Sequence, residues 1–164
     1  MTQLEQTLIA GLSMWALSQD GFPQTKPDDS TEIREAVVES VERLNRPACS
    51  SLLGANARDI LISARFVVIS FGKPKLGSDG KFKVISASVD GDRNTIIINS
   101  EGPFMDPRLT VNGVRFNLGL DDHRFRALIL LHELGHLTGK FQHDGADPEL
   151  SRTYSNSVRE ACFL

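Results

Sequence analysis

Apolar residues recur at helical spacing in the first third of the chain. Segments 4–17, 30–45 and 50–63 each place apolar side chains three and four positions apart, which is the pattern of an amphipathic helix. A stretch rich in Pro, Gly and Asp at 19–30 separates the first two segments, and Pro47 is expected to end the second. We therefore predict an N-terminal helix and linker, followed by two further helices.

The period changes to that of β-strands in the middle of the chain. Residues 66–71 are β-branched and aromatic, residues 82–89 alternate between apolar and polar, and residues 94–99 hold three consecutive isoleucines. The lysine-containing stretch between the first two strands suits the tip of a solvated hairpin, and Asp90-Gly91 is a hairpin signal between the last two. This succession predicts a small antiparallel sheet.

The last third of the chain is helical again. A loop rich in Gly, Pro and Asp covers residues 100–122, with a short strand predicted at 114–117. The acidic pair 121–122 is placed to cap a helix that Gly139 ends. A terminal helix is predicted for 149–162. The order of helices, sheet and helices is that of an α+β protein.

Length and composition limit the class of protein. A chain of 164 residues fits one domain with its own hydrophobic core, so we predict a single α+β domain over 1–164. The formal net charge of −3 argues against nucleic acid as a partner, because phosphate binding needs a basic surface. No segment reaches the ~18 apolar residues that a membrane span needs.

The cysteines and the N-terminal apolar stretch bear on the cellular compartment. Cys49 and Cys162 either pair in an oxidising compartment or stay as buried thiols, and the sequence leaves both open. The stretch 8–17 has the length of a signal-peptide core, but no basic residue precedes it and Glu5 carries the opposite charge. An amphipathic helix is the simpler interpretation. The compartment stays open, with the cytoplasm favoured over secretion or the periplasm.

All four histidines lie between residues 123 and 143, and two of them share a helix face. His132 and His136 are four positions apart on the predicted helix, so their imidazoles project from one side about one turn apart. That spacing suits two nitrogen ligands of one Zn²⁺ at ~2.0–2.1 Å, and Glu133 is placed to accept a proton from a metal-bound water. The apolar run 127–131 indicates a buried helix. A buried helix with these polar groups needs a metal or a dense hydrogen-bond network.

One stretch resembles the active-site helix of the zincin metallopeptidases: residues 130–139, Leu-Leu-His-Glu-Leu-Gly-His-Leu-Thr-Gly. The resemblance implies that His132 and His136 are zinc ligands and that Glu133 is the general base of peptide hydrolysis. It also implies a zincin-like fold, with a small antiparallel sheet packed against the active-site helix and flanking helices. In that fold the strand 94–99 takes the place of the edge strand that pairs with extended substrate.

The zincin patterns for the third zinc ligand fit this chain incompletely. The metzincin pattern, H-E-x-x-H-x-x-G-x-x-H, is followed through Gly139, but its third histidine is replaced by Gln142, with His143 one residue later. No methionine follows Met105, so the Met-turn of metzincins is missing. The gluzincin pattern places a glutamate on a later helix, where this chain has Glu160.

Three residues after His136 are therefore the main candidates for the third ligand. His143 ranks first, because imidazole suits zinc and Gly139 permits the needed turn. Asp144 and Glu160 are the alternatives, since other zincins complete the site with a carboxylate.

These features predict a zinc-dependent metallopeptidase that hydrolyses a peptide or protein substrate. Two alternatives stay open. One is a zinc-binding domain without turnover, in which a fourth side chain closes the site. The other is a metal-free structural or partner-binding domain, in which hydrogen bonds satisfy the histidines. Tyr154, the only tyrosine, could donate a hydrogen bond to the developing oxyanion, although packing is its more ordinary role.

Overall fold

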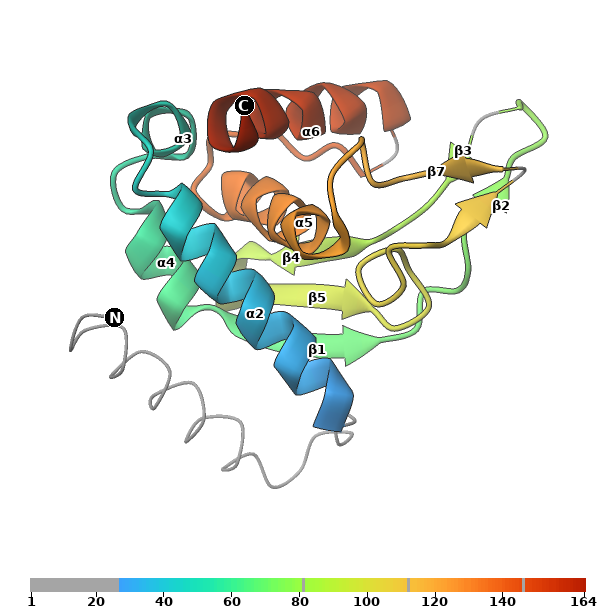
Figure 1. The fold of residues 1–164 in the computed structure, drawn as a ribbon, viewed down its shortest axis with the longest axis horizontal. Coiled ribbons are helices and arrows are strands. Elements are labelled where there is room, and N and C mark those ends of the chain that lie inside the picture. Colours follow the sequence, from blue (N-terminus) through green and yellow to red (C-terminus); the bar gives the residue numbers. More distant parts are fainter. Residues whose placement is uncertain (1–26, 81, 112, 146) are drawn as a thin grey trace.

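The computed structural model describes four stretches of the chain: residues 27–80, 82–111, 113–145 and 147–164. The helix predicted for 4–17, and the linker up to residue 26, lie outside these stretches. Within them the protein is α+β, with five helices and a three-stranded mixed sheet (Figure 1). The predicted α+β class is confirmed to that extent.

The elements are numbered as in Figure 1. The helices are α2 (Pro27–Arg43), α3 (Pro47–Leu53), α4 (Ala57–Ser63), α5 (Asp122–Leu137) and α6 (Pro148–Phe163). The strands are β1 (Arg65–Ile69), β2 (Lys75–Leu76), β3 (Phe82–Lys83), β4 (Ala87–Asp90), β5 (Thr95–Asn99), β6 (Thr110–Val111) and β7 (Val114–Arg115). None of these helices is long and apolar enough to span a membrane.

The main sheet has the strand order β1-β5-β4. β4 pairs with β5 antiparallel across the short 3-10 turn Gly91–Arg93, as the hairpin signal predicts. β1 pairs with β5 in parallel, with Arg65 opposite Thr95. The sheet is therefore mixed, and the prediction of an antiparallel sheet is wrong for β1. The connection 70–86 is long enough to carry the chain across the sheet, so β4 forms on the far side of β5 and β5 inserts beside β1.

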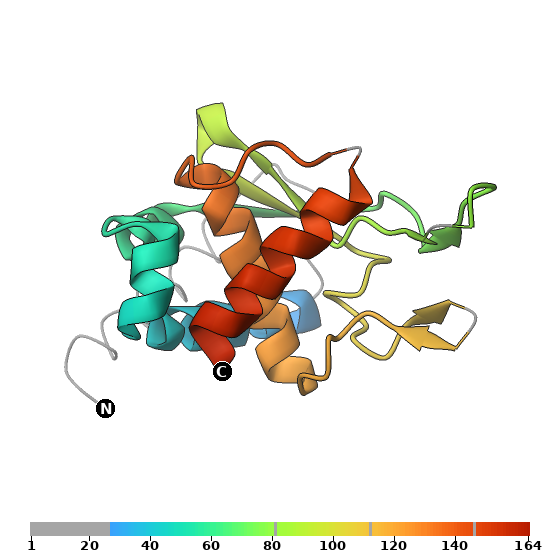
Figure 2. The ribbon, with the colours of Figure 1, turned by 90° about the horizontal axis from the view of Figure 1, so that it is seen from above.

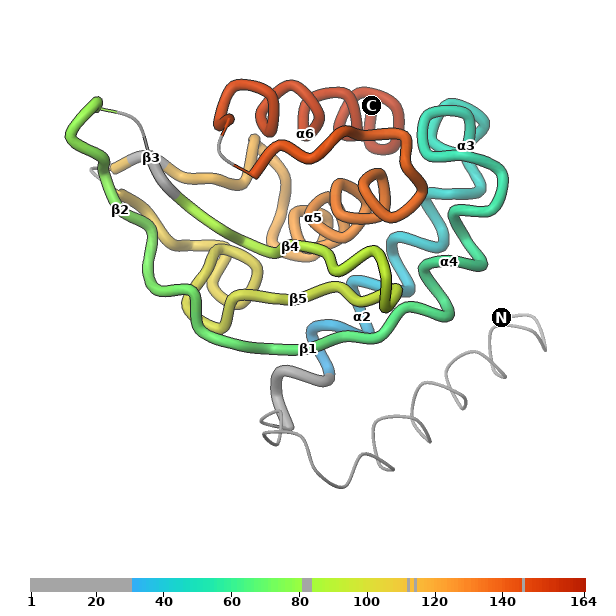
Figure 3. The backbone as a smooth tube through the Cα atoms, turned by 180° about the vertical axis from the view of Figure 1, so that it is seen from behind, coloured from blue at the N-terminus to red at the C-terminus, as the bar shows by residue number. Residues whose placement is uncertain are grey.

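β5 is the central strand and β4 is an edge strand. The expectation that 94–99 lies at the edge is wrong, because this segment pairs with a strand on each side. β4 packs beside α5, and Figure 3 shows the two elements next to each other. The free edge of the sheet nearest α5 therefore belongs to β4.

Two short hairpins extend from the same end of the molecule, to the right of the helices in Figure 2. β2 and β3 form a hairpin in the stretch predicted as a hairpin tip. The prediction that the strand 66–71 pairs across this tip with the strand 82–89 is wrong, because β1 pairs with β5. The strand predicted at 82–89 is divided between this hairpin and β4. The short strand predicted at 114–117 is present as β7, paired with β6.

The early helices differ in their ends from the predicted ones. α2 begins at Pro27 instead of Ser30, and proline suits a first helical turn because its fixed φ is helical and its missing N–H needs no partner there. Pro47 likewise starts α3. The helix predicted for 50–63 is interrupted at Gly54, whose φ of +100° is a conformation that glycine adopts readily. The segment therefore forms two short helices.

The hydrophobic core lies where α5 meets the sheet and the other helices. Ile96 and Ile98 of β5 are fully buried, and alternate residues of a strand point to one face. Leu130, Leu131 and Leu134 of α5 are also fully buried. α5 contacts α2, α3, α4, α6 and β4, so this helix is a central element of the fold.

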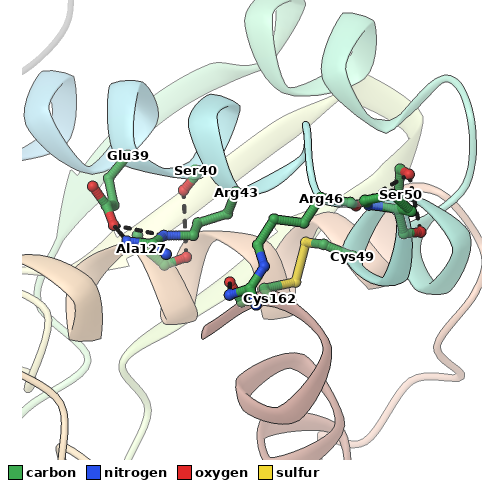
Figure 4. Close-up of a disulfide and its surroundings, with 9 residues drawn as sticks. Glu39, Ser40, Arg43, Arg46, Cys49, Ser50, Ala127 and Cys162 are labelled. Atoms are coloured by element: carbon green, nitrogen blue, oxygen red, sulfur yellow. Dashed lines mark hydrogen bonds and ion pairs between the residues drawn. A yellow bond between two sulfur atoms is a disulfide. The ribbon is translucent and has the colours of Figure 1, made fainter. Parts of the chain in front are cut away.

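A disulfide joins Cys49 of α3 to Cys162 near the end of α6 (Figure 4). Both residues are fully buried, and their Cα atoms are 4.7 Å apart. Arg46, just before α3, donates a hydrogen bond to the carbonyl of Cys162 at 2.8 Å. Of the two states that the sequence leaves open, the structure has the paired one. The end of α6 is thereby fixed to α3.

Candidate metal centre

The candidate metal centre is built on α5, whose bounds agree with the prediction. The side chain of Asp121 caps the helix by accepting a hydrogen bond from the backbone N–H of Arg124 at 2.9 Å. The residues 127–135 are all buried, including His132 and Glu133. The helix therefore holds the motif inside the protein rather than on a solvated face.

Three side chains place candidate ligand atoms close together. Nε2 of His132 lies 3.1 Å from Oδ2 of Asp144 and 3.2 Å from Nε2 of His136. Nε2 of His136 lies 3.4 Å from Oδ1 of Asp144. His132, His136 and Asp144 form a group that could hold a metal ion. Two imidazole nitrogens and a carboxylate oxygen are a donor set that divalent metals bind.

The third member of this group is Asp144, which ranks behind His143 in the sequence analysis. Gly139 adopts a φ of +69° directly after α5, and the chain then returns so that Asp144 faces both histidines. The side chain of His143 is exposed and outside the group. Glu160 is exposed on α6 and is also outside it.

Two serines of α6 face the group, and sequence reasoning missed both. The hydroxyl Oγ of Ser155 lies 3.0 Å from Nδ1 of His132. Ser151 is near enough to Asp144 to help lower the pKa of that carboxyl. The two serines are four positions apart, so they share one face of α6. That spacing was the only signal in the sequence, and it is common on helices whose serines face solvent.

An aromatic pair packs against the two histidines. The rings of Phe141 and Tyr154 are stacked in parallel, with their centroids 4.4 Å apart. Each ring meets both imidazoles edge-to-face, at centroid distances of 5.9 to 6.3 Å. The ring of Tyr154 therefore has a packing role in this structure.

Gly135 allows Phe141 to lie against α5. The backbone N–H groups of Lys140 and Phe141 donate to the carbonyl of Gly135, at 2.9 and 3.0 Å, which turns the chain back over the helix. A Cβ at position 135 would lie 2.2 Å from the Phe141 ring. The close approach of Phe141 therefore explains why residue 135 is a glycine in this fold.

Burial and nearby charges shift the pKa values of the group in different directions. Burial raises the pKa of Glu133 to about 7, while His132 lowers it and Asp144 raises it. Partial burial on its own would raise the pKa of Asp144, but the hydrogen bond with His132, the nearby side chain of Ser151 and the charge of the two histidines hold it at about 2. Burial lowers the pKa of His136, against the attraction of Asp144. The site therefore keeps an ionised aspartate beside an imidazole that favours its neutral form, which is the form that binds metals.

No protein-family model, curated protein or solved structure matches this chain. The resemblance to zincins therefore rests on residues 130–139 alone. The chemistry of the site is therefore what bears on function.

Proposed function

We propose that this protein is a zinc-dependent peptidase whose zinc ligands are His132, His136 and Asp144. The observation that carries the proposal is how close the candidate ligand atoms lie to one another. Nε2 of His132 is 3.2 Å from Nε2 of His136 and 3.1 Å from Oδ2 of Asp144, and Nε2 of His136 is 3.4 Å from the other oxygen of that carboxylate, Oδ1. Ligands of a tetrahedral Zn²⁺ bound at ~2.0–2.1 Å are separated by about 3.3 Å, which follows from the tetrahedral angle. Three protein ligands with a fourth position for water is the composition of catalytic zinc sites, whereas structural sites have four.

The neighbour of the first ligand supports hydrolysis over simple metal storage. Glu133 is buried and directly follows His132 on α5. A bound zinc supplies a Lewis acid that polarises a carbonyl and acidifies water. Glu133 accepts the proton of the attacking water and returns it to the nitrogen of the leaving amine. A site that only stored the metal would gain nothing from a buried carboxyl at this position, which costs free energy to desolvate.

The edge strand β4 supports a peptide as the substrate class. β4 packs beside α5, and its outer edge pairs with no other strand of the described sheet. An extended peptide can add to such an edge through main-chain hydrogen bonds. In the zincin resemblance this role belongs to an antiparallel edge strand, and β4 is antiparallel to its neighbour β5.

Zinc content of purified protein, with and without zinc reconstitution, tests the ligands. Wild type is expected to hold about one zinc per chain, and His136→Ala to lose it. His123→Ala is the matched control, because His123 lies on the same helix but is 47% exposed and outside the group. Asp144→Ala beside His143→Ala decides the third ligand, and only the first is expected to lose zinc. A wild type without zinc after reconstitution would refute the proposal and favour the metal-free alternative.

Hydrolysis of a mixed peptide library, with and without chelator, tests turnover. Glu133→Gln preserves the shape of the side chain but removes the base, so zinc should stay bound while the rate falls by roughly 10²–10⁴-fold. Zinc-loaded wild type without activity against the library would favour a zinc-binding domain without turnover. An active Glu133→Gln variant would refute the role of Glu133.

A further inference from the structure

The polar face of α6 lies against one of the candidate ligands. The hydroxyl Oγ of Ser155 contacts Nδ1 of His132 at 3.0 Å. α6 packs against α5, and Figure 2 shows the two helices crossing. We infer that Ser155 is a positioning residue that orients His132 for metal binding, an inference that rests on the proposed metal centre.

The contact with Ser155 sets the direction of the His132 ring. Nε2 faces Asp144 and His136, so this nitrogen has to present its lone pair to a metal. The ring proton then resides on Nδ1, which lies 3.0 Å from the hydroxyl oxygen of Ser155. A histidine ligand commonly donates its second N–H to an oxygen, and this contact fixes the orientation of the ring.

Ser155 also weakens a competing arrangement of the metal-free site. Nε2 of His132 is 3.1 Å from Oδ2 of Asp144, so a proton on Nε2 would form a hydrogen bond to the carboxylate and block the metal. The hydroxyl of Ser155 can accept the proton at Nδ1 instead. Without this acceptor, the buried Nδ1–H group of His132 would donate no hydrogen bond to residue 155, and the blocked tautomer would gain population.

α6 is a suitable support because its end is tied to another helix. Near that end, Cys162 is bonded to Cys49 of α3. At its start the side chain of Asp147 caps the helix by accepting hydrogen bonds from the backbone N–H groups of Glu149 and Leu150, at 3.0 and 3.1 Å. Ser155 therefore presents its hydroxyl from a capped helix that a disulfide fixes to α3.

Zinc affinity of the full chain, measured by competition with a chromophoric chelator, tests the inference. Ser155→Ala is expected to weaken zinc binding by roughly 10–100-fold. Ser155→Thr keeps the hydroxyl and should restore most of the affinity. Ser157→Ala is the matched control, because the Ser157 hydroxyl bonds to the carbonyl of Thr153 within α6, and it should bind zinc as wild type does.

Two further readouts separate positioning from a loss of folding. The melting temperature of the metal-free Ser155→Ala variant should change no more than that of Ser157→Ala. The visible bands of the cobalt-loaded protein, which respond to ligand geometry, should shift in Ser155→Ala and not in Ser157→Ala. If wild type binds zinc and Ser155→Ala binds it equally tightly, the inference is overturned while the proposed function stands. If wild type binds no zinc, both are overturned.

Discussion

Removal of the Cys49–Cys162 disulfide is expected to lower the stability of the protein by several kilocalories per mole. The perturbation is the double variant Cys49→Ala/Cys162→Ala. The two cysteines are 113 positions apart, so the bond closes a loop over most of the described chain. A cross-link of this kind reduces the conformational entropy of the unfolded chain, and the reduction grows with the logarithm of loop length.

The size of the effect follows from that separation of 113 residues. The chain-entropy relation assigns about 4.7 kcal/mol to a loop of 100 residues at 25 °C, which becomes about 5 kcal/mol here. Residual structure in the unfolded chain reduces this value, so the expected loss is ~2–5 kcal/mol. Domains are commonly stable by about 5–15 kcal/mol, so the loss is a large share of the total.

Urea unfolding followed by circular dichroism measures this loss. Wild type in a reducing buffer should approach the stability of the double variant, and the variant itself should not respond to the reductant. This comparison separates the cross-link from the lost packing of the two sulfur atoms. A double variant within about 1 kcal/mol of oxidised wild type would refute the reasoning, because the entropy term alone exceeds that value.

Three further predictions follow from buried contacts. The amide of fully buried Asn99 donates to the carbonyls of Gly72 and Ile85, both at 2.8 Å, so Asn99→Asp removes two buried donors and should cost about 2–6 kcal/mol in urea unfolding. Asn117→Asp is its control, since Asn117 accepts a hydrogen bond from Gly119 and an aspartate can do the same. Gly135→Ala should lower the melting temperature and the zinc affinity. Displacing Phe141 costs roughly 1–3 kcal/mol, whereas alanine recovers only about 1 kcal/mol through its higher helix propensity. An unchanged zinc affinity would contradict this prediction, because it would show that Phe141 can move freely. The pKa of Asp144 is lowered from 3.8 to about 2, so its contribution to the stability of the metal-free protein is present above pH 4 and is lost as the pH falls toward 2. The difference in unfolding free energy between wild type and Asp144→Asn should shrink over that range, and a constant difference would contradict this account.

Local patterns in the sequence were sufficient for the elements that carry the site. α5 could be predicted from its acidic cap, its apolar run and the glycine that follows it, and α6 from its periodicity. The pairing of His132 with His136 needs no tertiary structure, because residues four apart on a helix always face the same side. The β4–β5 hairpin also follows from a local turn signal.

Contacts between distant segments were beyond the reach of those patterns. The parallel pairing of β1 with β5 depends on the path of the connection between them, and local signals say nothing about that path. The same holds for the pairing of Cys49 with Cys162. The sequence is compatible with either a disulfide or two free thiols, and only the packing of α3 against α6 brings the two cysteines together.

The motif on α5 was therefore determined by the sequence itself, whereas the completion of the site was decided by tertiary structure. His143 and Asp144 are neighbours in a loop, and successive side chains of a loop point in different directions. Which of them meets the two histidines depends on how the chain turns after Gly139 and where α6 docks. Helix geometry constrains residues within one turn, but a ligand from a loop is positioned only by the packing of the elements that the loop connects.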